Sequence, residues 1–282
     1  MKRILIAGAD SYIGTSFEKR ALEEPENYSL YTVDMRENSW RQTDFSDYDV
    51  VLYVAGIAHI KETKNNAGLY YEVNRDMAIE TAKKAKSSGV KQFIFLSSMS
   101  VYGKYTGVIT NITEPDPVTN YGRSKLEAEQ GLLKLMDDNF SVALLRPPMV
   151  YGKDCRGNYQ TLRKLALKCP CFPDINNKRS MIYIDNLTEF IKYLVDDRKS
   201  GLFFPQNADY VTTSEMVSLI AKSHGKRIHL TRLFNPLLKI LKINVVKKAF
   251  CDLVYDMSMS ECKVDYRVCN LDESISMTEA NV

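Results

Sequence analysis

The sequence predicts an α/β protein built on a doubly wound parallel sheet, with a small α/β cap in its C-terminal part. Short apolar runs alternate with longer amphipathic stretches, which is typical of parallel strands joined by crossover helices. A turn that contains glycine follows the first apolar run, where such sheets turn from strand to helix. The 282 residues are 45% hydrophobic and 26% charged, so the chain can bury a large core.

The elements of the first half follow one another regularly. We place five strands at Arg3–Gly8, Ser29–Asp34, Val50–Ala55, Gln92–Ser97 and Val142–Arg146. Helices fall between them at Tyr12–Leu22, Leu69–Ser88 and Asn120–Met136. The segment between Asp34 and Val50 is too short for a full strand-helix-strand connection, so we expect a crossover helix to be missing there.

The pattern loosens beyond Tyr151 into shorter elements, including a strand at 201–204 and a helix at 211–224. No internal repeat or low-complexity linker interrupts the chain. We therefore expect two parts, with residues 1–152 forming the core and residues 153–282 mainly forming the cap, some of whose segments return to the core sheet.

Charge and composition exclude several classes of protein. The formal net charge of +3 gives no strong field for binding nucleic acid. The apolar run after Met1 is too short for a signal peptide or a membrane span, so we expect a cytoplasmic protein without membrane insertion. A locally basic region is expected to be a solvated helix face; it contains Lys239, Lys242, Lys247 and Lys248.

The six cysteines and three histidines give little support to a metal site. The cysteines include no CxxC pair, and no histidine stands at zinc-ligand spacing from them. We expect reduced, structural thiols and no bound metal.

The first strand ends in the run Gly8-Ala9-Asp10-Ser11-Tyr12-Ile13-Gly14, and a helix begins there. Backbone amides at such a helix start can hold the pyrophosphate of a dinucleotide. The run resembles the GxxGxxG loop of short-chain dehydrogenases, with Ser11 where that family has its middle glycine. A tight turn that needs Gly8 and Gly14 only for packing remains the alternative.

Asp34 ends the second strand, twenty residues beyond Gly14. A carboxylate there can accept hydrogen bonds from both hydroxyls of an adenosine ribose and would repel a 2′-phosphate, which favours NAD. Arg36 can offset part of that charge, so NADP stays possible. An ordinary aspartate at a strand end is the alternative.

Tyr121 and Lys125 stand at i and i+4, on one face of the expected helix. A tyrosine is a poor acid-base group at neutral pH, and an adjacent ammonium is expected to lower its pKa. This spacing alone also fits an exposed helix pair.

A serine-rich run, Ser97-Ser98-Met99-Ser100, follows the apolar strand upstream of Tyr121. Sheet enzymes place catalytic groups at strand ends. We choose Ser98 to bind the substrate oxygen while Tyr121 takes the proton and a nicotinamide takes the hydride. Serines that only cap the strand end are the alternative.

Taken in order, these motifs resemble the extended short-chain dehydrogenase family, which contains epimerases, dehydratases and reductases of nucleotide sugars. The resemblance covers most of the chain and implies a Rossmann-like core. It implies that Lys125 also contacts the nicotinamide ribose and that Asn74 supports the fold. It implies further cofactor contacts at Asp44, Phe45, Ala55, Gly56 and Pro147.

The same resemblance implies a nucleotide diphosphate on the substrate. Arg179, in Asn177-Lys178-Arg179-Ser180-Met181-Ile182, matches the arginine that grips the diphosphate, and a planar guanidinium suits phosphate oxygens. Asn158 matches a second diphosphate contact, and Ser100 lies on the substrate side of the serine run. A surface basic pair is the alternative for Arg179.

The pattern resembles most the UDP-glucose 4-epimerase-like subgroup, which is associated with surface polysaccharide synthesis. A UDP-hexose or UDP-N-acetylhexosamine 4-epimerase is therefore expected, with a possible homodimer. A 4-keto reductase of a UDP-4-keto-6-deoxy-N-acetylhexosamine needs the same Ser-Tyr-Lys set and stays open. A dehydratase ranks third because Met99 and Ser100 stand where it would need acidic groups. A non-catalytic dinucleotide sensor or scaffold is the remaining class, supported by Ser11 in the glycine loop.

Overall fold

The structure, a computed structural model, describes residues 1–58, 60, 62–233, 235–236 and 244–280. The chain divides into two compact units, and each consists of several segments. Unit 1 contains Met1–Gly103, Glu114–Pro147 and Leu187–Pro205. Unit 2 contains Lys104–Thr113, Pro148–Asn186 and Gln206–Val282.

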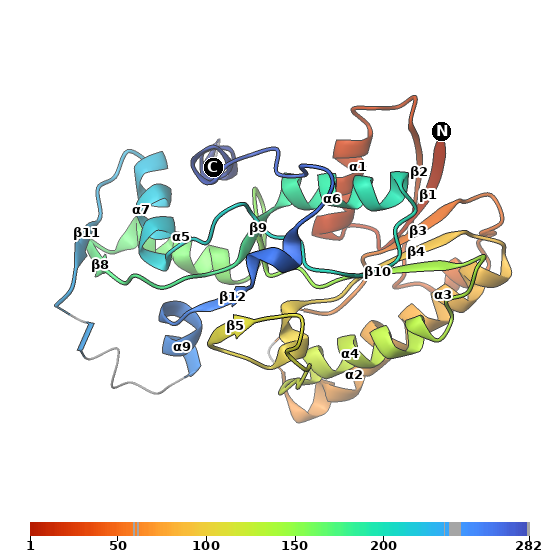
Figure 1. The fold of residues 1–282 in the computed structure, drawn as a ribbon, viewed down its shortest axis with the longest axis horizontal. Coiled ribbons are helices and arrows are strands. Elements are labelled where there is room, and N and C mark those ends of the chain that lie inside the picture. The colour runs from red at the N-terminus through yellow and green to blue at the C-terminus, as the bar shows by residue number, and fades with distance from the viewer. Residues whose placement is uncertain (59, 61, 234, 237–243, 281–282) are drawn as a thin grey trace. The chain divides into compact units, whose positions relative to one another are not determined.

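Unit 1 contains a parallel sheet with the strand order β10-β6-β4-β3-β1-β2 (Figure 1). The chain starts at β1, runs out to the neighbouring edge strand β2, returns past β1 to β3 and then continues through β4 and β6 to the other edge at β10, so the expected doubly wound α/β fold is confirmed. Each expected strand is found within two residues at either end. The bounds are β1 Lys2–Ala7, β2 Tyr28–Val33, β3 Val50–Tyr53, β4 Gln92–Leu96, β6 Ser141–Leu145 and β10 Gly201–Phe203.

Helices cover both faces of this sheet (Figure 1). One face carries α1 (Tyr12–Ala21) and α6 (Ile184–Asp196), and the other carries α2 (Ala67–Tyr71), α3 (Met77–Ser87) and α4 (Asn120–Leu133). Small side chains on α3 and α4 let these helices approach the sheet closely. Their buried contributions to the core are Ala78, Ala82, Ala85, Ala128 and Leu132, which pack with alternate strand residues such as Leu5, Val51 and Phe93.

The link between β2 and β3 has only a short 3₁₀ turn, Asn38–Arg41, in place of a crossover helix, as expected. Trp40 of this turn is 1% exposed and packs into the same core as Met35 and Phe45. These three side chains fill the space that the apolar face of a crossover helix covers in a regular unit.

The single helix expected over Leu69–Ser88 is found in three parts. A π-helical turn, Glu72–Asp76, separates α2 from α3. Asn74 lies in this turn and is fully buried. A π turn inserts an extra residue into a helix and rotates the side chains that follow. Sequence periodicity does not detect it, because the apolar spacing continues on both sides.

Unit 2 is made of short elements. Among its described residues, three pairs of parallel strands occur, β12 with β5, β7 with β9 and β11 with β8. Their bounds are β5 Gly107–Ile109, β7 Met149–Tyr151, β8 Cys171–Pro173, β9 Met181–Tyr183, β11 His229–Thr231 and β12 Leu253–Tyr255. Helices in the described part of this unit include α5 Asn158–Lys168, α7 Thr213–Ser223, α9 Asn244–Phe250 and α10 Leu271–Glu279, and a 3₁₀ turn lies at Met257–Ser260.

Helix α7 begins two residues later than expected. Thr212 caps it and forms a capping box with Glu215. Val211 instead pairs its backbone with Arg179 across an antiparallel bridge. An N-cap residue has an extended backbone, so the capping threonine ends the strand-like segment that contains Val211.

All six cysteines are free thiols, as expected. No helix within the described part of the chain is long and apolar enough to cross a membrane. In the expected basic segment, Lys239 and Lys242 lie outside the described residues, and Lys247 and Lys248 belong to α9.

Candidate functional site

The turn after β1 shows why glycine is needed at position 8. Gly8 has a φ of +136°, and a Cβ on it would lie 2.7 Å from the backbone nitrogen of Ala55. Ser11, at the expected glycine position, is the N-cap of α1, and its Oγ accepts a hydrogen bond from the Gly14 amide at 3.2 Å. The amides of Tyr12 and Ile13 belong to the first turn of α1, where backbone N–H groups have no helical acceptor and can hold phosphate oxygens.

The Asp34 carboxylate follows β2, and β2 lies beside β1 in the sheet. Arg36 binds it with two prongs, from Nε to Oδ1 at 2.9 Å and from Nη2 to Oδ2 at 2.6 Å. The same Nη2 donates to Asp10 at 2.9 Å. The hydrogen bonds from Arg36 lower the pKa of Asp34 and keep this carboxylate ionised. Arg36 is an exposed side chain, and the Asp34 side chain is itself 32% exposed.

Two expected cofactor contacts lie in the link between β2 and β3. The Asp44 carboxylate is exposed and accepts hydrogen bonds from the backbone and the hydroxyl of Ser46, both at 2.9 Å. The Phe45 side chain is fully buried in the core. Any contact of Phe45 with a ligand must therefore use its backbone.

The loop after β3 passes close to the candidate catalytic lysine. A Cβ on Gly56 would lie 3.0 Å from Asn74 Oδ1 and 3.3 Å from Lys125 Nζ. Asn74 holds this loop, because its Oδ1 accepts from the Ile57 amide at 2.8 Å and its Nδ2 donates to the Ile57 carbonyl at 3.1 Å. The glycine leaves the space between the loop and the lysine open.

Ser98 lies near enough to Tyr121 to act on the pKa of the tyrosine, which it lowers. Ser98 starts the 3₁₀ turn Met99–Tyr102 directly after β4, and its Oγ accepts from the Ser100 amide at 3.1 Å and donates to the Ser100 hydroxyl at 3.1 Å. Tyr121 lies in the first turn of α4, which Thr119 caps by accepting from the Gly122 amide. The structure thus brings the chosen serine and tyrosine together.

Lys125 lies one turn further along α4 and is 5% exposed. Its Nζ donates to the Leu96 carbonyl at 2.7 Å and lies 4.5 Å from the centre of the Phe95 ring. Burial lowers the pKa of Lys125 to about 7, and the negative charge of Glu129 acts in the opposite direction. The lysine therefore changes its charge near neutral pH, which an exposed lysine does not do.

The expected lowering of the Tyr121 pKa is wrong for the protein without its cofactor. Burial raises this pKa because it disfavours the charged phenolate, and the neighbouring Ser98 hydroxyl offsets only part of the rise. The charge of Lys125 does not offset it either. Lys125 loses its proton near pH 7, so its positive charge is gone before Tyr121 ionises. A lysine four residues away favours the phenolate only while its ammonium form is maintained.

A buried ion pair follows the catalytic turn of α4. Arg146, directly after β6, binds Glu129 from Nε to Oε1 at 3.0 Å and from Nη2 to Oε2 at 2.5 Å. Its Nη1 donates to the Tyr102 hydroxyl at 2.8 Å. The next residue, Pro147, is buried, and its carbonyl accepts from the Met99 amide at 3.0 Å.

The two residues expected to bind the diphosphate belong to unit 2. Arg179 is partly buried, its Nη1 donates to the Cys251 carbonyl at 3.2 Å, and within the described residues its guanidinium forms no salt bridge. Burial lowers the pKa of Arg179. Asn158 is the exposed first residue of α5, whose N-cap Gly157 offers no side chain to the first amides. Both positions leave polar groups for an anion.

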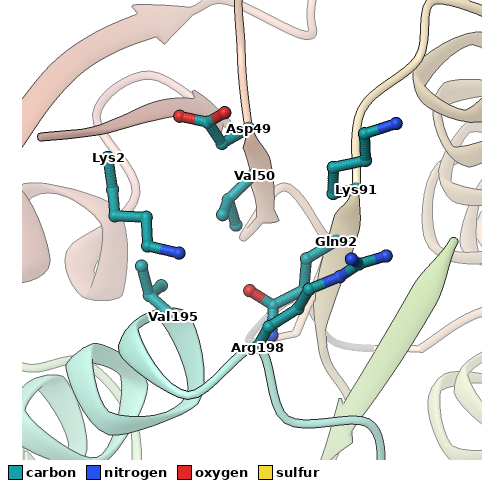
Figure 2. A pocket seen from close by; sticks show the side chains of 7 residues that line it. All are labelled: Lys2, Asp49, Val50, Lys91, Gln92, Val195 and Arg198. Carbon is teal, nitrogen blue, oxygen red and sulfur yellow. The ribbon is translucent and has the colours of Figure 1, made fainter. Parts of the chain in front are cut away.

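A separate hollow lies at the opposite edge of the sheet of unit 1 (Figure 2). Lys2 and Gln92 line it at the starts of β1 and β4, together with Asp49 and Arg198. Gln92 donates to the Leu194 and Lys199 carbonyls at 2.8 and 2.9 Å. Parallel strands place their starts and ends at opposite edges, so this hollow is separate from Ser98, which follows the end of β4.

The NAD dependent epimerase/dehydratase family matches residues 4–203, which include every candidate catalytic residue. The chain belongs to this family. It is therefore an enzyme of the epimerase/dehydratase type.

The relatives of this family member include 4-epimerases. UDP-glucose 4-epimerase of Vibrio cholerae is 31% identical over 246 residues, which are 78% of this chain and 75% of the relative. An N-acetyl-alpha-D-glucosaminyl-diphospho-ditrans,octacis-undecaprenol 4-epimerase of Escherichia coli O157:H7 is 26% identical over 253 residues, covering 83% and 76%. UDP-glucuronic acid 4-epimerase of Bacillus cereus, solved with NAD, shares the fold with a TM-score of 0.78 and 19% identity, covering 98% and 95%.

Within this epimerase/dehydratase enzyme, sequence reasoning missed the group formed by Tyr102, Glu129 and Arg146. Glu129 follows Lys125 by four residues, and this spacing was the one available signal. Nothing local pairs Glu129 with Arg146, because the contact joins a helix to the end of the next strand. The group lies beside the candidate catalytic residues.

Proposed function

We propose that this enzyme interconverts the 4-epimers of a UDP-hexose or UDP-N-acetylhexosamine by transferring a hydride at C4. The observation that carries the proposal is that Ser98, at the carboxyl end of a parallel strand, lies near Tyr121, with the buried Lys125 one helical turn beyond the tyrosine. The names of the two curated relatives support 4-epimerisation, and both name a sugar carried on a diphosphate.

The cofactor of this proposal is NAD, and the residues of unit 1 fit it. The close approach of Gly8 to Ala55 and the first-turn amides of α1 suit a pyrophosphate, and Asp34 suits a ribose. Residues 1–152 would hold the cofactor, and residues 153–282 would mainly hold the substrate. NAD, when bound, accepts the C4 hydride and later returns it.

Residues of the chain itself remove the proton of the C4 hydroxyl and later return it. Ser98 donates a hydrogen bond to the C4 oxygen, and Tyr121 as phenolate removes the hydroxyl proton as the hydride leaves C4. The sugar is then a 4-ketone, with both electrons of the C4–H bond on the cofactor. Tyr121 gives the proton back when the hydride returns to the other face. The Lys125 ammonium favours the phenolate and would contact the nicotinamide ribose.

Arg179 and Asn158 would bind the diphosphate of the substrate. A partly buried guanidinium without a carboxylate partner among the described residues has donors left for two phosphate oxygens. Replacing Arg179 by Lys should raise KM by about tenfold or more with a smaller change in kcat, because Lys keeps the charge and loses the planar fork.

The test of the function uses purified protein without added cofactor. We expect it to retain NAD and to interconvert UDP-glucose with UDP-galactose, or the two N-acetylhexosamines, without net change in reduced nicotinamide. Tyr121→Phe should lose nearly all turnover while keeping the fold. Stoichiometric consumption of added NADH with a 4-keto sugar would establish the reductase instead, and wild-type turnover of Tyr121→Phe would contradict the role given to the tyrosine.

A second set of substrates separates the two diphosphate carriers. The same assay with a polyprenyl-diphosphate sugar decides between a free nucleotide sugar and a lipid-linked one, which the name of the Escherichia coli relative raises. A role in surface polysaccharide synthesis, a cytoplasmic location and a homodimer stay predictions. Light scattering of the purified protein checks the dimer.

A further inference from the structure

The buried pair of Glu129 and Arg146 is not used by the chemistry above. Its side chains are 2% and 7% exposed, and its two-pronged geometry is close to ideal. Taking two charges out of water costs several kcal/mol per ion, and the attraction between them often does no more than offset that cost. A gain in net stability therefore explains a pair of this kind poorly. Its position, one turn of α4 beyond Lys125, indicates a role at the candidate site.

The pair joins three segments that carry catalytic or cofactor groups. Glu129 lies on α4 one turn beyond Lys125. Arg146 precedes Pro147, whose carbonyl binds the Met99 amide, and it also donates to the Tyr102 hydroxyl at the end of the turn that Ser98 begins. Moving either charged side chain would shift α4 against the Ser98 turn.

The pair also sets the charge around Lys125. The groups that face the lysine come from neighbouring turns and strands: Tyr121 and Glu129 on α4, the Leu96 carbonyl and the Phe95 ring on β4, Asn74 beyond Gly56, and Arg146 behind Glu129. Within this set Glu129 is the only carboxylate. Its charge is partly neutralised by Arg146, so the ion pair controls how much negative charge reaches the lysine.

We propose that Glu129 and Arg146 are positioning residues, which hold the Lys125 turn of α4 against the Ser98 turn and supply the negative charge that favours the ammonium form of Lys125. The inference rests on the proposed hydride transfer, because that reaction needs the ammonium beside Tyr121. Removing the Glu129 charge should make the enzyme lose activity at a lower pH.

The test is the pH profile of kcat/KM for Glu129→Gln. Gln has the same shape, and its Oε1 still accepts from Arg146. We expect the alkaline limb of the profile to move down by roughly one pH unit, because a nearby carboxylate favours a cation by that amount in a partly buried site. A limb that coincides with that of the wild type overturns the proposal.

Glu127→Gln is the matched control on the same helix. Glu127 pairs at the surface with Arg75, and its side chain is 34% exposed. The alkaline limb of the kcat/KM profile of this variant should coincide with that of the wild type. Arg146→Lys keeps the positive charge and loses the two-pronged contact, so kcat should fall while the limb stays in place. A limb that shifts as far in Glu127→Gln as in Glu129→Gln also overturns the proposal.

Two further measurements keep the proposal testable if the single variant fails to fold or the activity is absent. The double variant Glu129→Gln/Arg146→Met removes both buried charges, which is often tolerated, and should show a smaller downward shift of the limb. The pH dependence of unfolding reports the charge of Lys125 without any turnover. If Glu129→Gln leaves the Lys125-dependent part of that curve unchanged, the proposal fails, whatever the substrate proves to be.

Discussion

Lys125 makes the free energy of unfolding depend on pH, and this dependence can be worked out from the structure. The unfolded chain holds the lysine proton up to its ordinary pKa of 10.5, whereas the folded protein releases it near pH 7 because the site is buried. Between these values the unfolded state binds more protons, so the stability rises with pH. The buried ammonium destabilises the folded state below pH 7, and this cost disappears as pH increases.

The perturbation is Lys125→Met, which keeps the length and removes the titrating group. From the two pKa values, the free energy of unfolding of the wild type should rise between pH 7 and pH 9 by about 2 kcal/mol more than that of this variant. Urea unfolding of both proteins at the two pH values, with the cofactor removed, measures the difference. The wild type also has to release the Leu96 contact on unfolding, but that contribution does not produce a slope in this window.

Lys192→Met is the control for this measurement. Lys192 is buried as well, but its hydrogen bonds and ion pairs with Glu24 and Glu189 outweigh burial and raise its pKa. Its titration therefore lies above the window, and the difference from the wild type should be the same at pH 7 and pH 9. Parallel curves for the wild type and Lys125→Met over this range would refute the assignment of a lowered lysine pKa.

Three further predictions follow from single contacts. Gly8→Ala places a Cβ 2.7 Å from the Ala55 nitrogen at a φ of +136°, so the protein should be purified without NAD and with a lower Tm; an unchanged NAD content contradicts this. Asn74→Ala leaves backbone groups of the loop after β3 unpaired and should cost about 2–4 kcal/mol in urea unfolding, whereas a loss under 1 kcal/mol would mean that water replaces the amide. Glu279→Gln should make stability depend less on pH in the acid range. Burial raises the pKa of Glu279, but the hydrogen bonds from His224, Tyr159 and Arg163 lower it by more, so the net pKa is lowered. The stability from this carboxylate is present at neutral pH and is lost as pH falls through the lowered pKa, which thermal unfolding from pH 7 to pH 3 checks.

The sheet could be predicted because its signals are local. Each of the five strands expected in the first half is a mostly apolar stretch of five or six residues that ends in a small or polar residue, and the first helix begins directly after Ser11, a good N-cap. The missing crossover helix was visible from length alone. The π turn at Asn74 was not, because its cause is a set of hydrogen bonds to the Ile57 backbone that only the folded chain assembles.

The candidate site could be predicted in part. Motif order paired Ser98 with Tyr121, and the structure brings these two side chains near each other. The direction of the Tyr121 pKa shift was missed, because spacing gives the charge of a neighbour and says nothing of burial, which acts first on Lys125. The partners of Arg146 were missed for the same reason as Asn74, since both depend on contacts between distant segments.

The return of the chain to unit 1 through α6 and β10 has a consequence for how the protein is made. In the sequence, α6 and β10 come after α5, β8 and β9 of unit 2. Nevertheless β10 completes the sheet of unit 1 beside β6, and Glu189 of α6 binds Arg20 of α1. During synthesis the apolar edge and one face of the sheet therefore stay open until about residue 205 has left the ribosome. A fragment that ends near residue 152 would leave that surface exposed to water, so we expect unit 1 to fold only when its last segment, Leu187–Pro205, is present.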